Sequence, residues 1–320
     1  MGSAPARGMH WAPPKRPSID ELSRSHAIGL PAAACAVGRG HRGASLSRVT
    51  TAAWLLLGAT LGLPAQGWCV QVSDDLGRPV ALAQAAQRIV TLAPHATELV
   101  LAAGGGDRLV GIAAGGSYSP SIAGLPRIGG PGALDRERLL TLRPDLVIAW
   151  QSGNRASDLD WIEGIGIALY RSEPASLRDI ASTIRAIGRL ADNTPAAEHA
   201  ALRFEKSLET RCTHQPLLPA YIEVWDRPAM TIGGSHWIND VLRHSGYRNI
   251  FGHVARGVFA IADEARYVSR GALRISLLPG RAGGAHSRLA DLLSRPTPSL
   301  AEAIELLCTG RLGVTVQSQP

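Results

Sequence analysis

Residues 139–150, Leu-Leu-Thr-Leu-Arg-Pro-Asp-Leu-Val-Ile-Ala-Trp, are the part of the chain around which the rest is organised. Pro144 ends a helical turn here, because its ring pushes Arg143 out of the α region. The unbroken apolar run at 146–149 is typical of a strand buried on both faces of a parallel sheet. Ligands of open α/β sheets bind just beyond the carboxyl ends of the strands. Trp150 therefore stands either at the mouth of a binding site or at the closing end of the core.

Strand and helix patterns alternate on both sides of this stretch. The first part of the chain predicts a hairpin at 70–80, strands at 88–94, 109–112 and 165–170, and helices at 95–103 and 177–190. A loop at 129–132 and a helix that carries Glu137 are expected before the central stretch. The last part predicts strands at 220–225, 230–232 and 273–278 and helices at 236–244 and 299–308. Such alternation indicates parallel sheets with crossover helices, so the fold class is α/β.

A different helix separates these two parts. Thr194 is suited to its N-cap and Pro195 to its first position, and the helix runs to about Arg211, before two prolines. A long, moderately apolar helix at this place most simply connects two lobes. We therefore expect an N-terminal lobe at 69–193, a linker helix within 194–213 and a C-terminal lobe at 218–320.

The chain begins with a segment that predicts export. Residues 1–47 have no sustained apolar period, so we expect a disordered extension there. Residues 48–67 are typical of a signal peptide: arginines precede an apolar run of about 12 residues, and small residues follow at Ala65 and Gly67. The run is too short to span a bilayer of about 30 Å. Because the bulky Trp68 precedes Cys69, we expect cleavage rather than lipidation, and a periplasmic mature protein.

Charge excludes one class of partner. Residues 1–68 contain seven basic and two acidic residues, a charge of +5, whereas residues 69–320 contain 26 basic and 24 acidic residues, a charge of +2. The basic excess is thus a property of the leader. The folded part has no surplus to neutralise phosphates, so we expect no nucleic-acid partner.

The motifs of common enzymes and metal sites are absent from the sequence. It contains no Gly-x-Ser-x-Gly, no phosphate-binding Gly-x-x-x-x-Gly-Lys-Ser/Thr and no His-Glu-x-x-His, so we do not expect an enzyme. His95 and His236 stand near strand ends without the close spacing of a metal pair. An alternative from another class is a periplasmic metal chaperone or enzyme that uses these histidines. Cys69, Cys212 and Cys308 remain after cleavage, and their spacing dictates no pairing.

Large rings stand at the ends of apolar runs in both expected lobes. They are Tyr118, Trp150, Trp225 and Phe259. Such side chains give broad, rigid apolar contact at a low entropic cost. Ordinary core filling is the other interpretation, but rings at strand ends favour ligand binding.

Several blocks of the chain resemble the periplasmic cobalamin-binding proteins, the solute receptors of vitamin B12 importers. The blocks are residues 88–104 (Arg-Ile-Val-Thr-Leu-Ala-Pro-His-Ala-Thr-Glu-Leu-Val-Leu-Ala-Ala-Gly), 134–139, 143–150, 246–251 and the Arg-Pro-Thr-Pro at 295–298. The resemblance covers about residues 88–308. It implies two lobes, each with a central, mainly parallel sheet flanked by helices, joined by one long rigid helix, with the ligand held between the lobes.

The resemblance also assigns roles to individual positions. Trp150 matches the ring that packs on the corrin, Phe259 a second aromatic, and Asp291 and Arg295 a pair that reaches the polar periphery of the ligand. Trp225 and Tyr118 match less directly. Glu137 resembles the first-lobe glutamate that docks onto the membrane permease, and Asp263 or Glu264 its counterpart in the second lobe.

The chain departs from this family in three places. Pro131 replaces a tryptophan, and residues 251–284 match poorly. Ser245 replaces a cysteine that would bridge to Cys308, which leaves Cys308 as an expected free thiol.

The sequence thus predicts a monomeric periplasmic binding protein that captures cobalamin or a related corrinoid and delivers it to the permease and ATPase of an ABC importer. We expect no cofactor other than the transported ligand itself. An iron siderophore or haem in the same fold is the alternative.

Overall fold

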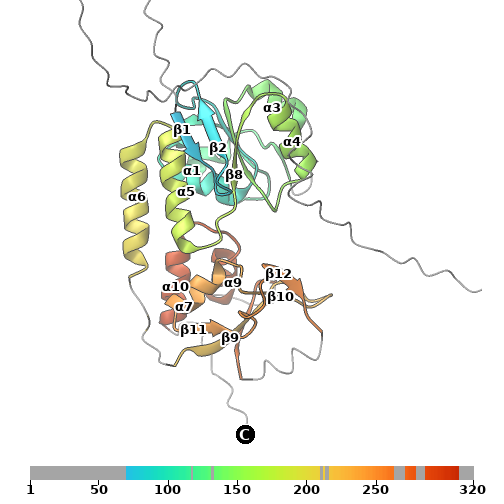
Figure 1. Cartoon of the computed structure of the whole chain (residues 1–320), viewed down its shortest axis with the longest axis vertical. Helices are drawn as coiled ribbons and strands as arrows, with labels where there is room; N and C mark the ends of the chain where they lie inside the picture. The colour runs from blue at the N-terminus through green and yellow to red at the C-terminus, as the bar shows by residue number, and fades with distance from the viewer. Residues whose placement is uncertain are drawn as a thin grey trace, which may run out of the picture. The chain divides into compact units, whose positions relative to one another are not determined.

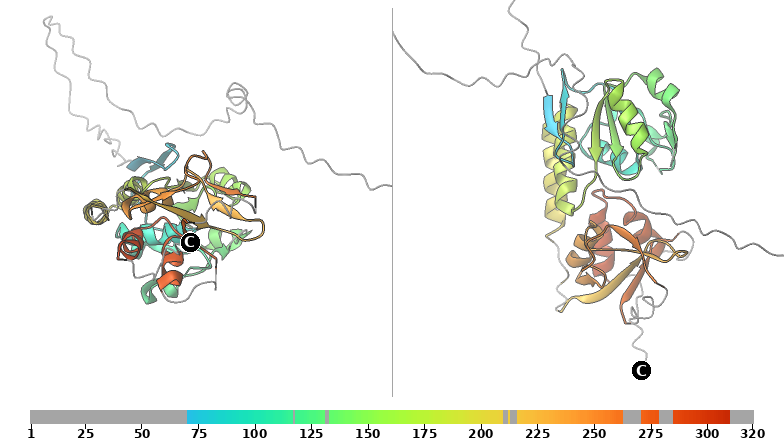
Figure 2. Two further views of the ribbon diagram at one scale, coloured as in Figure 1. Left: turned by 90° about the horizontal axis from the view of Figure 1, so that it is seen from below. Right: turned by 45° about the vertical axis from the view of Figure 1, so that its right-hand side comes forward.

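The computed structural model describes residues 70–116, 118–130, 133–209, 212, 216–262, 271–278 and 285–309 (Figures 1 and 2). The expected extension, signal peptide and Cys69 lie outside the described residues, as do Pro131, Asp263 and Glu264. Within the described part no helix is long and apolar enough to cross a membrane.

The first half of the described chain builds a four-stranded parallel sheet in the order β4-β3-β7-β8. Its strands are β3 (Ile89–Thr91), β4 (Leu109–Gly111), β7 (Leu146–Trp150) and β8 (Ala168–Ser172). The helices of this half are α1 (Pro94–Ala102), α2 (Pro120–Ala123), α3 (Arg136–Leu142) and α4 (Ala156–Gly164). Because β3 pairs with β4 on one side and with β7 on the other, the strand order reverses between β3 and β7. In open α/β sheets such a reversal opens a crevice at the carboxyl ends of the two strands.

The stretch around β7 folds as its sequence predicts. Arg143 leaves the right-handed α region and adopts a left-handed conformation at φ 45°, ahead of Pro144. The Asp145 carboxylate then accepts hydrogen bonds from the backbone N–H groups of Gln87 (2.7 Å) and Arg88 (3.0 Å), which fixes the start of β7 beside the start of β3. The apolar residues of β7 are buried on both faces: Leu146 and Ile148 belong to one core cluster, and Val147 and Ala149 to another.

The predicted hairpin is present as β1 (Val70–Ser73) and β2 (Pro79–Leu82), which pair antiparallel around a turn. A second small antiparallel pair joins β5 (Gly129–Gly130) and β6 (Ala133–Leu134), where the sequence predicted only a loop.

Along the chain, two long helices follow the first sheet and precede the second. They pack side by side (Figure 1). The first, α5 (Leu177–Leu190), has the predicted bounds, and Ser176 and Asp179 form a capping box at its start. The predicted linker helix is α6 (Thr194–Ser207), which ends four residues before Arg211. It begins one residue earlier than predicted, because Asn193 rather than Thr194 occupies the N-cap position. At 14 residues it is about 21 Å long. The predicted linker helix is thus accompanied by a partner helix.

The second half builds a three-stranded parallel sheet in the order β11-β9-β13. Its strands are β9 (Leu218–Glu223), β11 (Tyr247–Asn249) and β13 (Leu273–Ser276), and an antiparallel pair is formed by β10 (Met230–Ile232) and β12 (Val258–Ala260). The helices are α7 (Ile238–His244), α9 (Ala285–Leu292) and α10 (Leu300–Cys308). The predicted fold class, α/β with parallel sheets flanked by helices, is confirmed.

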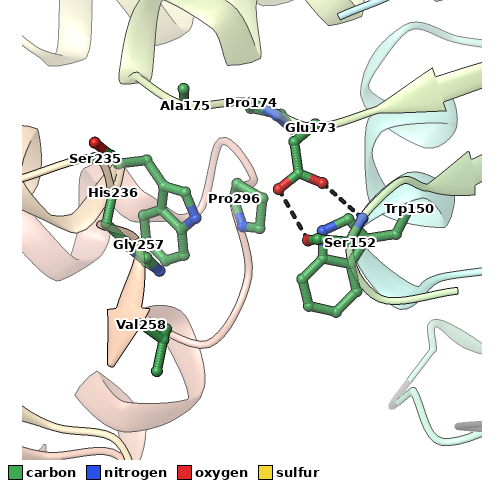
Figure 3. A pocket seen from close by; sticks show the side chains of 11 residues that line it. Trp150, Ser152, Glu173, Pro174, Ala175, Ser235, His236, Gly257, Val258 and Pro296 are labelled. Carbon is green, nitrogen blue, oxygen red and sulfur yellow. Dashed lines mark hydrogen bonds between the residues drawn. The ribbon is translucent and has the colours of Figure 1, made fainter. Parts of the chain in front are cut away.

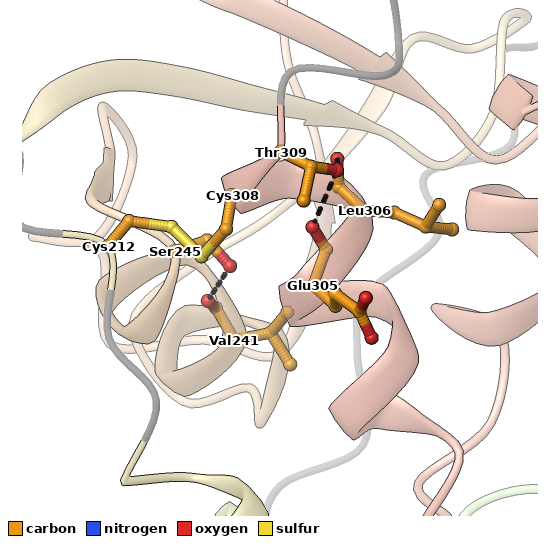
Figure 4. Close-up of a disulfide and its surroundings, with 7 residues drawn as sticks. All are labelled: Cys212, Val241, Ser245, Glu305, Leu306, Cys308 and Thr309. Atoms are coloured by element: carbon orange, nitrogen blue, oxygen red, sulfur yellow. Dashed lines mark hydrogen bonds between the residues drawn. A yellow bond between two sulfur atoms is a disulfide. The ribbon is translucent and has the colours of Figure 1, made fainter.

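One expectation about the cysteines is wrong. Cys308 is not a free thiol but forms a disulfide with Cys212, 96 residues earlier, with Cα atoms 5.5 Å apart (Figure 4). The Cys212 N–H donates to the carbonyl of His244 (3.2 Å), so Cys212 lies beside Ser245, the position that the resemblance assigned to the partner cysteine. Ser245 itself is buried and donates to the carbonyl of Val241 (2.8 Å).

Candidate functional site

Trp150 ends β7 and leaves the core there. Its side chain is 38% exposed, whereas the four preceding residues of the strand are fully buried. The His95 ring, from the first turn of α1, meets the indole edge-on with the ring centroids 5.4 Å apart. The indole also lies directly over Gly153, where any Cβ would overlap the ring. Trp150 thus lies at the strand-order reversal, where its ring contacts the buried ring of His95 and packs over Gly153.

Asn154 joins the ends of the two strands at this reversal. Its side-chain oxygen accepts from the Trp150 N–H (2.7 Å), and its side-chain amide donates to the carbonyl of Leu92 after β3 (3.1 Å). Because one side chain satisfies groups from both strand ends, the turn that presents the indole is fixed to the sheet.

A carboxylate stands next to the indole. Glu173, just after β8, accepts from the Ser152 N–H with Oε2 and from the Ser152 hydroxyl with Oε1, both at 2.9 Å. Its own N–H donates to the carboxylate of Asp75 (2.8 Å), which also accepts from the hydroxyls of Tyr170 and Thr183. Burial raises the pKa of Asp75, and these hydrogen bonds oppose that rise. The hairpin therefore anchors the chain segment that presents Glu173.

His236 and Trp237 come from the loop that leads into α7. Their rings lie 4.9 Å apart at a tilt of 39°. The Asn239 side chain supports this loop, because its amide donates to the carbonyls of Gly233 (2.7 Å) and His236 (2.9 Å). The Nδ1 of His236 accepts from the Ile238 N–H (3.2 Å). Burial lowers the pKa of His236 to about 4, so the imidazole is neutral at physiological pH.

These two sets of residues line one pocket of about 320 Å³ (Figure 3). Small-molecule sites usually measure about 300–1,000 Å³. The lining residues are Trp150, Ser152, Glu173, Pro174, Ala175, Ser235, His236, Trp237, Gly257, Val258 and Pro296. The first five come from the part of the chain before α5, and the rest from the part after α6. The pocket thus combines aromatic walls with a single carboxylate.

His95 is a packing residue in this structure. It is only 2% exposed, and its Nε2 lies 3.3 Å from the Ser172 hydroxyl. Burial, assisted by the positive charge of Arg295, lowers its pKa to about 4. Among the described residues no group of three or more His, Cys, Asp or Glu side chains is placed to hold a metal ion. Neither His95 nor His236 belongs to such a group among the described residues.

Of the sequence candidates, Trp150 lines the pocket and the other aromatic residues are placed elsewhere. Tyr118 donates to the carbonyl of Ala113 (2.9 Å) and lies under the Arg127 guanidinium. Trp225 is 54% exposed and donates to the carbonyl of Arg227 (3.1 Å). Phe259, on β12, packs its ring edge-on against Phe251 at 6.1 Å.

Asp291 and Arg295 are joined to each other beside the pocket. Arg295 pairs with Asp291 (3.1 Å) and with Glu98 of α1 (3.2 Å), and it directly precedes the lining residue Pro296. Its charge is therefore shared by two carboxylates. Glu137, the expected docking residue, is exposed on α3.

Sequence reasoning missed most of the pocket. Ser152 and Glu173 follow strand ends, and Trp237 follows the Gly233-Gly234 loop after β10. Their position just beyond the end of a strand was the signal that could have identified them. This signal was used only for aromatic residues. Helix α4 was also missed, and with it the segment that follows the Trp150 turn.

The chain matches the family model described as periplasmic binding protein over residues 89–272. It is 30% identical over 246 residues to the vitamin B12-binding protein of Vibrio vulnificus, covering 71% of this chain and 90% of that relative. The crystal structure of the periplasmic vitamin B12-binding protein of Vibrio cholerae is similar with a TM-score of 0.62 and 28% identity, over 73% of this chain and 99% of that one. A periplasmic haem-binding protein of Roseiflexus, 19% identical, shares the fold with a TM-score of 0.58, over 70% of this chain and 98% of that one.

The chain therefore belongs to the periplasmic binding protein family. Its predicted resemblance to the cobalamin-binding members is confirmed by these relatives, which are named as binding proteins.

Proposed function

We propose that this protein captures cobalamin or a related corrinoid in the pocket of Trp150 and delivers it, in the periplasm, to an ABC importer. The observation that carries this proposal is the half-exposed indole of Trp150, which shares a pocket with the rings of His236 and Trp237. Flat apolar surfaces suit the face and edge of a macrocycle. The names of the relatives point to the same ligand.

The charges of the pocket favour a corrinoid over haem or a siderophore. None of the eleven lining residues is Arg or Lys, and the carboxylate of Glu173 is their single ionised group, because His236 is neutral. Haem carries carboxylates, which such a pocket repels, and anionic siderophores require cations. A corrinoid is larger than about 320 Å³, so only a part of it can lie within the pocket as it stands.

The test is an equilibrium titration of the exported, mature protein with cyanocobalamin. The Trp150→Ala variant is expected to bind about five- to thirtyfold more weakly, because a buried ring face contributes about 1–2 kcal/mol. Gly153→Ala is expected to weaken binding as well, since the new methyl group displaces the indole. Trp161→Ala removes a ring of α4 that lies outside the pocket, beside the Arg136 guanidinium, and is the matched control, with unchanged affinity.

Absence of binding up to about 100 μM, or about −5.5 kcal/mol, would rule out cyanocobalamin as the ligand. Equal loss in Trp150→Ala and Trp161→Ala would contradict the location of the site.

Delivery would use the acidic side chain of Glu137, which is exposed and lies outside the pocket lining. Rim charges of this kind set the register and rate of association more than its strength. The proposed partner is the permease with its ATPase, and the second acidic contact falls at Asp263 or Glu264, beyond the described residues.

A further inference from the structure

Glu173 is a hydrogen-bond acceptor with a fixed direction. Both of its oxygens are held by Ser152 at 2.9 Å, and its backbone is tied to Asp75 at 2.8 Å. Each carboxylate oxygen has two lone pairs, so each can accept one further hydrogen bond. The residue lines the pocket and so offers this capacity to a ligand (Figure 3).

His236 is a donor with a fixed tautomer. A neutral imidazole has one N–H, and its other nitrogen accepts. Since Nδ1 accepts from the Ile238 N–H, the proton resides on Nε2. A protonated Nε2 cannot coordinate a metal, but it can donate a hydrogen bond. The Asn239 amide donates to the backbone carbonyl of His236 (2.9 Å), so a hydrogen bond fixes the loop that carries the imidazole.

We propose that Glu173 and His236 together select a primary carboxamide on the ligand and reject a carboxylate at the same place. A carboxamide donates through its NH₂ group and accepts through its carbonyl, which complements an anionic acceptor and a neutral donor in one pocket. A carboxylate has no proton to give and would face Glu173 with a like charge. This inference rests on the proposed function, because amides at the periphery distinguish corrinoids from haem.

The experiment compares cyanocobalamin with its monocarboxylic acids, in which one peripheral amide has been hydrolysed. At pH 7 the wild-type protein is expected to bind at least one of these acids about tenfold or more weakly than cyanocobalamin, through like-charge repulsion in a partly desolvated site. In Glu173→Gln this discrimination is expected to fall below about threefold, since the new amide can donate to the carboxylate. Glu305→Gln, which removes an exposed charge on α10 outside the pocket, should retain the wild-type discrimination.

Two results would overturn the inference while leaving the proposed function intact. In the first, every monoacid binds the wild-type protein as tightly as cyanocobalamin. In the second, the discrimination persists in Glu173→Gln. If the wild-type protein binds no cyanocobalamin at all, the corrinoid assignment fails and the carboxamide pair fails with it. Thermal melting of each variant shows that a changed affinity does not arise from unfolding.

Discussion

Trp150 is exposed because of what surrounds it rather than because of its own chemistry. The strand before it is buried on both faces, so the indole must pass beyond the sheet, where His95 supports its edge and Gly153 leaves room for its face. The His95 imidazole is buried in this arrangement, and burial disfavours its protonated form. The same residue therefore couples the site to pH.

Lowering the pH should reduce stability through His95. Its pKa is lowered from 6.5 to about 4 in the folded protein, so only the unfolded chain gains a proton between these values. The free energy of unfolding should be highest above pH 6.5, fall by about 3 kcal/mol on account of His95 as the pH drops toward 4, and lose no more from this group below that.

Urea denaturation of wild type and His95→Gln at several pH values between 7 and 4 checks this expectation. The variant should show a shallower loss, whereas His199→Gln, at an exposed histidine of α6, should follow the wild type. Parallel curves for wild type and His95→Gln would show that His95 is not the group responsible.

At the scale of elements, the contact between α5 and α6 is set by small residues. Gly188 and Ala197 meet so closely that a Cβ at Gly188 would overlap that of Ala197, with the carbonyl oxygen of Asn193 at 3.3 Å behind it. At the edge of the contact, Arg185 donates to the carboxylates of Glu198 and Glu205 at 2.7–3.0 Å. These hydrogen bonds lower the pKa of both glutamates. The two helices thus behave as one support in place of a single connector.

Gly188→Ala should destabilise the protein although alanine favours helices. The gain in helix propensity is about 1 kcal/mol, whereas overpacking a tight contact costs about 1–3 kcal/mol. We expect a net loss of about 1 kcal/mol in the free energy of unfolding, measured by urea denaturation. Ser182→Ala, at an exposed position of α5, should change it by less than about 0.5 kcal/mol. A variant more stable than wild type would mean that the helices can separate without cost.

At the scale of the whole molecule, the Cys212–Cys308 disulfide ties the segment after α6 to the end of α10. The two cysteines are 96 residues apart in the sequence, and all described strands of the second sheet lie between them. A cross-link across so long a loop restricts the unfolded chain strongly. An oxidising compartment such as the periplasm permits such a bond to form.

Removing this bridge in the double variant Cys212→Ser/Cys308→Ser should lower the free energy of unfolding by about 2–5 kcal/mol. Thermal and urea denaturation measure the loss, and dithiothreitol should destabilise the wild type but leave the double variant unchanged. Intact mass under non-reducing conditions should show the bond in the wild type. A free Cys308 thiol in the oxidised, exported protein would contradict the pairing.

Elements with strong local signals could be predicted from the sequence. The apolar run of β7 and the amphipathic period of α5 appear where expected, and α6 begins one residue before its predicted start. The end of α6 was placed too late, and α4 was missed, because their ends depend on weaker signals. Trp150 was identified at the site because it follows the strand that the sequence marks most clearly.

The α/β class, the family and the strand end that carries Trp150 could all be inferred from the amino-acid sequence, since they follow from periodicity and matching over short stretches. The pairing of Cys308 with Cys212, in place of a partner at position 245, became visible in the folded chain, as did the pocket residues Glu173, His236 and Trp237. The physical reason is that pairing and lining depend on distances between segments far apart along the chain. Those distances are set by how sheets and helices pack, which no local pattern of residues contains.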